Sequence, residues 1–178
     1  MRNYLIIRLA LFTAIAVLIG VFSTQLMEYL QYLVGGVMIL FGVEGMILPI
    51  FKDYKKFLGD MQFYLGHVDM ILGIVIITSI PNFNDICIIW GTWTIVREAV
   101  DLYEIGHKAM HRFPALFSFA LSITEIVLSI LLIINAEEHH ALTHIYLLVP
   151  EFIITALSPL LFEVHKKRHQ KKENKQEE

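Results

Sequence analysis

Charged side chains stand inside a segment that is long enough to cross a membrane as a helix. Residues 85–105, DICIIWGTWTIVREAVDLYEI, are largely apolar but include Arg97, Glu98 and Asp101. Charges at this depth are costly and usually serve binding, transport or helix pairing. On a helix, Arg97 and Asp101 are four residues apart and can pair along one face. Glu98 points about 100° away, so it needs a partner on another helix.

Acidic residues recur in the other apolar segments, which predicts a polar cluster inside the membrane. Its members are Glu44, Asp69, Arg97, Glu98, Asp101, Glu125 and Glu151. Burial favours the neutral form of a carboxyl group and a nearby Arg favours the charged form, so only one or two of these acids would be ionised beside Arg97. Such a cluster is suited to taking up and releasing protons, or to binding a cation. The alternative is a structural network that only holds helices together through hydrogen bonds.

The composition indicates a membrane protein. Of 178 residues, 56% are hydrophobic, which is more apolar surface than a single water-soluble core of this size can bury. Cys87 is the only cysteine, so an internal disulfide is excluded. A single thiol in an apolar run is typical of a small core residue.

Six apolar segments predict an all-α, polytopic fold with six transmembrane helices. Each is close to the roughly 20 residues that a helix needs to cross about 30 Å of hydrocarbon. The predicted spans are Tyr4–Phe22, Leu30–Phe51, Met61–Ile80, Asp85–Ile105, Phe113–Asn135 and Ala141–Val164. The first span has a basic start like a signal peptide, but GVFSTQ is not a convincing cleavage site, so we expect a true first helix.

The distribution of basic residues predicts the orientation. Every Lys and Arg except Arg97 lies at a terminus, near one, or in the second or fourth loop, whereas the other loops carry only acidic charges. By the positive-inside rule, both termini are expected to be cytoplasmic in a multi-pass membrane protein.

An internal repeat is indicated by acids at regular offsets. Asp69 and Glu125 lie 56 residues apart, each followed four residues later by a small residue, and the same offset backwards reaches Thr13. On the even-numbered spans, Glu44, Glu98 and Glu151 recur at offsets of 54 and 53. These offsets predict three tandem two-helix hairpins, 4–51, 61–105 and 113–164, within one domain of residues 1–165.

The last two hairpins carry a family resemblance. SITEIVLSILLI with LLVPEFIITALSPLLF, and GHVDMILGIVII with IIWGTWTIVREAVDL, resemble the HdeD family of short six-span bacterial membrane proteins. The resemblance covers roughly residues 5–165, with Thr13 in place of an acid in the first helix and Pro150 at a position where a Gly is expected. It implies an inner-membrane protein with a role in acid resistance, and it supplies no catalytic residues.

Other residues suggest little further chemistry. Three histidine pairs have the spacing of four that can place two metal ligands on one helix face: His107 and His111, His140 and His144, and His165 and His169. Each pair lies at a membrane interface, where His is common without a ligand. Sensing of pH by the outer histidines beside Glu137 and Glu138 is another reading. We expect no metal, no cofactor and no enzymatic activity.

The expected partners follow from the same features. They are the lipid bilayer and, as one option, a second copy of the chain in a homo-oligomer. Any ion or small-molecule substrate is unknown. The basic segment that begins the tail at 166–178 is expected to continue the sixth helix into the anionic headgroup region rather than to bind nucleic acid, and the rest of the tail is predicted to be disordered.

Overall fold

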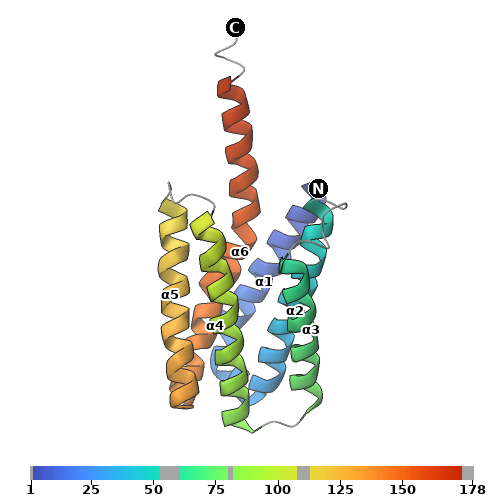
Figure 1. Cartoon of the computed structure of the whole chain (residues 1–178). Helices are drawn as coiled ribbons and strands as arrows, with labels where there is room; N and C mark the ends of the chain where they lie inside the picture. Colours follow the sequence, from blue (N-terminus) through green and yellow to red (C-terminus); the bar gives the residue numbers. More distant parts are fainter. Residues whose placement is uncertain (1, 53–60, 80–81, 108–112, 174–178) are drawn as a thin grey trace. The chain divides into compact units, whose positions relative to one another are not determined.

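The computed structural model describes residues 2–52, 61–79, 82–107 and 113–173, and the elements in these ranges are helical (Figure 1). They are α1 (Arg2–Leu26), a short 3-10 helix η1 (Met27–Tyr29), α2 (Leu30–Lys52), α3 (Met61–Thr78), α4 (Phe83–His107), α5 (Phe113–Ile134) and α6 (Glu138–Glu173). The all-α prediction is confirmed, and each of the six apolar segments forms a helix.

Side chains mark where two of the helices begin and end. Asn82 precedes α4, and its Oδ1 accepts a hydrogen bond of 2.9 Å from the backbone N–H of Asp85, which satisfies one of the free amides at the helix start. At the end of α3, the amide nitrogen of Gln31 lies within 3.1 Å of the carbonyl oxygens of Ile76, Ile77 and Ser79. Gln31 belongs to α2, so this contact fixes the end of α3 against its neighbour.

The helices form two compact units. The first contains residues 1–23 and 145–178, and the second contains residues 24–144. In the second unit, α2 packs closely along α3, α4 packs closely along α5, and α2 touches α4 more lightly (Figure 1). The predicted hairpin 61–105 joined α3 to α4, but the close contacts of this unit lie within α2–α3 and α4–α5.

Glycines allow α2 and α3 to pack backbone to backbone. A Cβ atom added to Gly42 would lie 2.7 Å from the carbonyl oxygen of Gly66, and one added to Gly73 would lie 2.5 Å from that of Gly35. No real Cβ contact is this short, so these positions require glycine. Close approach at small residues is a main source of helix association in membranes, where no hydrophobic effect drives one helix onto another.

The same contact recurs in the second helix pair at an offset of 56 residues. Gly35 faces the Gly73 carbonyl and the Ile77 side chain, while Gly91 faces the Ser129 carbonyl and the Ile133 side chain. Each contacting residue of the second pair lies 56 positions after its counterpart in the first pair, so α2–α3 and α4–α5 share one packing register. The predicted offset of 54 was the spacing between two acids, Glu44 and Glu98. The offset of 56 differs because the helix contact is made by small residues and not by these acids. In the register of the contact, Glu98 takes the place of Gly42.

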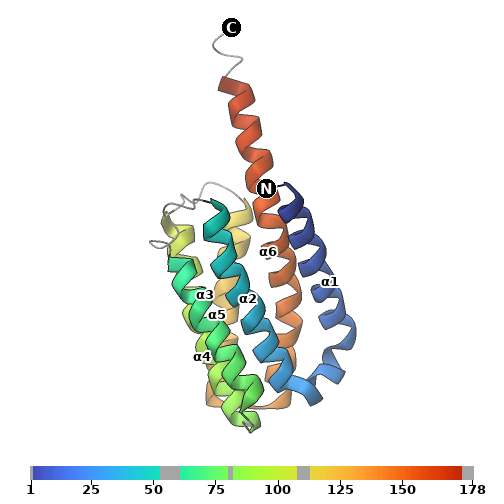
Figure 2. The ribbon, with the colours of Figure 1, turned by 90° about the vertical axis from the view of Figure 1, so that its right-hand side faces the viewer.

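The first unit pairs α1 with the C-terminal part of α6, and the two helices run antiparallel (Figure 2). The rings of Phe12 and Phe152 lie 5.4 Å apart between their centroids. Beside them, an open apolar groove of about 290 Å³ is lined by Thr13, Ala16, Val17, Gly20, Val21, Val149 and Ile153. The N-terminus of α1 and the C-terminal end of α6 lie at the same end of this unit.

The sixth helix continues into the C-terminal tail, as expected for the basic first part of that tail. α6 runs through Glu173. The added segment, KKRHQKKE, consists mainly of Lys, Arg, Gln and Glu, which are good helix formers. Extending an existing helix by such residues is favourable, because the costly first turn has already formed. The last five residues, 174–178, lie outside the described part of the chain.

The apolar surface is consistent with a membrane environment. Two stretches of the described residues, Ile6–Ile47 and Met61–Thr78, are long and apolar enough to cross a membrane, and Phe119–Ile134 is a shorter apolar helix. On α3, the side chains of Val68, Ile71 and Val75 share one exposed face. Apolar faces of this extent are unfavourable in water and normal against lipid.

Candidate functional site

Asp69 and Arg97 form an ion pair in the interior of the second unit. The Asp69 side chain, on α3, is 3% exposed and receives a hydrogen bond from the guanidinium of Arg97, on α4. The second carboxylate oxygen accepts a hydrogen bond of 2.7 Å from the indole N–H of Trp93. Both oxygens of this buried acid are therefore satisfied by α4.

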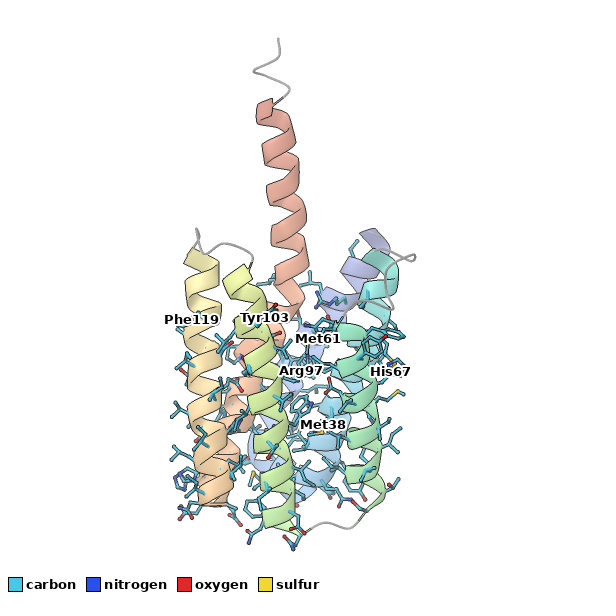
Figure 3. All side chains as sticks on the ribbon, viewed as in Figure 1. Met38, Met61, His67, Arg97, Tyr103 and Phe119 are labelled. Carbon is cyan, nitrogen blue, oxygen red and sulfur yellow. The ribbon has the colours of Figure 1, made fainter. Side chains whose placement is uncertain are left out.

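Aromatic rings complete the surroundings of Arg97. Its guanidinium carbon lies 4.4 Å from the centroid of Phe41, on α2, and 5.4 Å from that of Trp93. Cation–π contacts stabilise a cation that has left water. Figure 3 shows Arg97 on the side of α4 that faces α2 and α3. The group of Phe41, Asp69, Trp93 and Arg97 thus joins three helices, and we call it the ion-pair cluster.

A second polar group lies between α4 and α5. Glu98 is 7% exposed, and its carboxyl group hydrogen-bonds to Ser122 on α5. Glu125, one turn further along α5 and 2% exposed, is close enough to Glu98 for the two carboxyl groups to interact electrostatically. As its position on the helix predicts, Glu98 finds its partner on another helix.

His144 extends this group from the first turns of α6. It is 1% exposed and lies against Trp90, with ring centroids 5.1 Å apart. Its Nε2 is 3.3 Å from the hydroxyl oxygen of Ser129, and its Nδ1 is 4.0 Å from Oε2 of Glu125. The side chains of Glu98, Ser122, Glu125, Ser129 and His144 form what we call the carboxyl–histidine cluster.

Hydrogen bonding in the carboxyl–histidine cluster is incomplete. Within the described part of the chain, Oε1 of Glu125 has no hydrogen-bond partner of good geometry. Buried polar atoms are normally paired, and an unpaired one is costly. Two interacting carboxyl groups repel each other when both are charged, so the protonation of one depends on that of the other.

The structure divides the predicted polar set. It joins Asp69 to Arg97 and brings Glu98 close to Glu125, whereas Asp101 is exposed and Glu44 is half-buried. Glu151 is half-buried on the part of α6 that belongs to the first unit. The expected cluster therefore has an ion-paired part, Asp69 with Arg97, and a carboxyl part, Glu98 with Glu125, and Glu98 also interacts electrostatically with Arg97 and Asp101.

Several partners were not recognised from the sequence. Trp93 is not among the residues predicted from the sequence, Ser129 is predicted only as the small residue of the repeat, and His144 is predicted as part of an outer histidine pair. For Ser129, a signal existed in the repeat itself, because the residue four positions after Glu125 must lie on the same helix face as that acid. For Trp93 and His144, the contact depends on how two helices are rotated against each other.

Comparisons with known proteins give no match. No family model, no curated protein and no solved structure is similar to this chain.

Proposed function

We propose that this chain is a six-span inner-membrane protein that handles protons through its carboxyl–histidine cluster. The observation that carries the proposal is the electrostatic interaction between Glu98 and Glu125, two buried carboxyl groups, with the titratable imidazole of His144 4.0 Å from Oε2 of Glu125. A coupled pair of acids beside a histidine can accept a proton from one side and release it to the other.

The proposed topology has six spans and both termini in the cytoplasm. It is supported by the hydrophobic lengths of the six helices, by the segregation of Lys and Arg, and by the position of the start of α1 and the end of α6 at one end of the α1–α6 unit. The repeat is proposed to consist of three pairs, α2–α3, α4–α5 and α6–α1. The shared contact register of the first two pairs supports this arrangement, and Thr13 would be the counterpart of Asp69 and Glu125 in the third.

The family proposal rests on the sequence. The acid, three apolar residues and small residue of α3 and α5 resemble the HdeD pattern, and in both helices the small residue is the one that the neighbouring helix contacts. Proton handling by buried carboxyl groups would suit the acid-resistance role that this resemblance implies.

The chain is proposed to have no enzymatic activity. In space, His144 lies between Ser129 and Glu125, as a base lies between the nucleophile and the acid of a catalytic triad. The Ser129 side chain is completely buried, however. A substrate could not reach its hydroxyl group without separation of α5 from α6.

The test is proton flux into liposomes that contain the purified protein under an imposed pH gradient. Wild type is expected to conduct protons above the level of empty liposomes, and Glu125→Gln is expected to abolish this flux, because an amide keeps the size of the side chain but cannot exchange a proton in this way. Glu98→Gln should have the same effect, since both acids belong to one site.

Glu138→Gln is the matched control, because Glu138 is an exposed acid at the start of α6. All variants are compared at equal amounts of incorporated protein. If the flux of wild type equals that of empty liposomes, or if Glu98→Gln and Glu125→Gln conduct like Glu138→Gln, passive proton conduction by this cluster is wrong.

The second candidate function is a structural or oligomerising membrane scaffold. The ion-pair cluster favours it, because Asp69 has both carboxylate oxygens satisfied and Arg97 is enclosed by an acid and two rings. A scaffold predicts that Glu98→Gln and Glu125→Gln lower thermal stability in detergent and leave every pH-dependent property unchanged at matched protein levels.

A further inference from the structure

Three side chains with metal-binding atoms converge where α5 passes into α6. Glu137, His139 and His140 each offer one ligand atom, and these atoms all lie within 4.8 Å of one another. Nδ1 of His139 is 3.0 Å from Oε2 of Glu137, and the two imidazole rings lie 3.9 Å apart between their centroids. Ligands that surround one ion must be about this close together.

Asn135 holds two of these side chains in place. Its side-chain amide donates a hydrogen bond of 2.8 Å to Oε1 of Glu137, which leaves Oε2 directed to the histidines. Its backbone carbonyl oxygen lies 2.9 Å from Nδ1 of His140. A carbonyl oxygen can only accept a hydrogen bond, so Nδ1 of His140 must carry the proton. In the neutral imidazole, Nε2 then has a free electron pair that can bind a metal ion. Bonds of this kind, from a ligand's second nitrogen to a carbonyl, orient histidines in metal sites.

The backbone of the connection is also ordered by its own hydrogen bonds. The Glu137 N–H donates to the Asn135 carbonyl at 2.9 Å, and the N–H groups of His140 and Ala141 donate to the Glu137 carbonyl at 3.1 Å. Glu137, His139 and His140 are thus held on one short turn rather than on a long loop. Preorganised ligands lose less freedom on binding.

We propose that Glu137, His139 and His140 form a binding site for a divalent transition-metal ion such as Zn²⁺, Co²⁺ or Ni²⁺. Two imidazoles and one carboxylate are donors that suit these ions better than Mg²⁺ or Ca²⁺, which prefer oxygen ligands alone. Three protein ligands leave one tetrahedral position for water or for a further ligand.

This site differs from the histidine pairs with a spacing of four residues. His140 and His144 were considered together from the sequence, but His144 is buried against Trp90 and Ser129, whereas Glu137 and His139 are exposed. The proposed site is independent of proton handling by the carboxyl–histidine cluster, and either one can fail without the other.

The experiment is a titration of the purified full chain, without a polyhistidine tag, in detergent micelles. Co²⁺ is added first, because tetrahedral Co²⁺ with imidazole ligands absorbs visible light, and calorimetry with Zn²⁺ then gives stoichiometry and affinity. Wild type is expected to bind one ion. The double substitution of His139→Ala with His140→Ala is expected to remove both the absorption and the saturable heat.

Asn135→Ala keeps all three ligands and is expected to weaken binding about 10- to 100-fold, through the loss of the bond that orients Glu137. His67→Ala is the matched control for unspecific binding by an exposed histidine, since Nδ1 of His67 already contacts the Phe63 carbonyl. Wild-type heats that do not saturate, or an unchanged isotherm in the His139 and His140 double variant, would overturn the proposal.

Discussion

At the scale of single residues, Arg97 is the side chain whose loss should cost the most. Its removal leaves Asp69 as a buried acid without a cation, and breaking a buried pair in this way costs about 3–5 kcal/mol. Arg97→Met should therefore lower the free energy of unfolding, measured by chemical denaturation in mixed micelles, by about that amount.

The matching double variant identifies the cause. Asp69→Asn combined with Arg97→Met removes both charges, so it should recover a large part of the loss, and the Trp93 indole can still donate to the Asn oxygen. If the double variant is as unstable as the sum of the two single variants, the ion pair does not contribute to stability.

The residue chemistry could be predicted only in part from the sequence. Acids and a single arginine inside apolar segments show that buried polar contacts must exist, because hydrocarbon offers them no water. The sequence shows that Arg97 can pair with Asp101, four residues along its own helix, and the structure pairs Arg97 with Asp69, 28 residues away on α3. The choice depends on the rotation of α3 against α4, which no spacing within one helix reveals.

At the scale of helices, the glycine contacts predict a strong effect of one methyl group. In Gly73→Ala the new Cβ would lie 2.5 Å from the Gly35 carbonyl oxygen, so α2 and α3 must move apart. We expect a loss of about 1–3 kcal/mol in the free energy of unfolding, the usual cost of overpacking. Thermal denaturation in detergent measures the change.

Gly36 offers a matched control on the same helix pair, because a Cβ there would meet nothing within 4 Å. Gly36→Ala should be neutral or slightly stabilising, since Ala is the better helix former by about 1 kcal/mol. Equal losses for both variants would mean that helix propensity, rather than the α2–α3 contact, determines the stability.

Helix positions were easier to predict than helix partners. The predicted spans and the observed helices agree to within a few residues at most ends, because the thickness of hydrocarbon and the charged or Pro-containing loops set these limits. The predicted hairpins differ from the close pairs because each helix can form a hairpin with the helix before it or with the helix after it. The small residues that select the partner, such as Gly35 with Gly73, are identified only once the two helices are seen together.

At the scale of the whole molecule, the charge distribution predicts the sidedness of the protein. A fluorescent protein fused to the C-terminus should fold and fluoresce, and an alkaline phosphatase fused there should be inactive, because both termini are expected in the cytoplasm. In addition, Asn82→Cys in a Cys87→Ser background should react with a membrane-impermeant maleimide added from outside. An active phosphatase fusion would contradict the six-span topology.

The distance along the chain between Asp69 and Arg97 has a consequence for biosynthesis. The two residues are separated by 28 positions, and a ribosome that adds about 5–20 residues per second needs roughly 1.5–6 s for that length. During this interval α3 can already lie along α2, yet the cation for Asp69 has not been made. In the proposed six-span topology, Asp69 therefore either waits at the translocon or enters the bilayer with its proton until α4 supplies the cation.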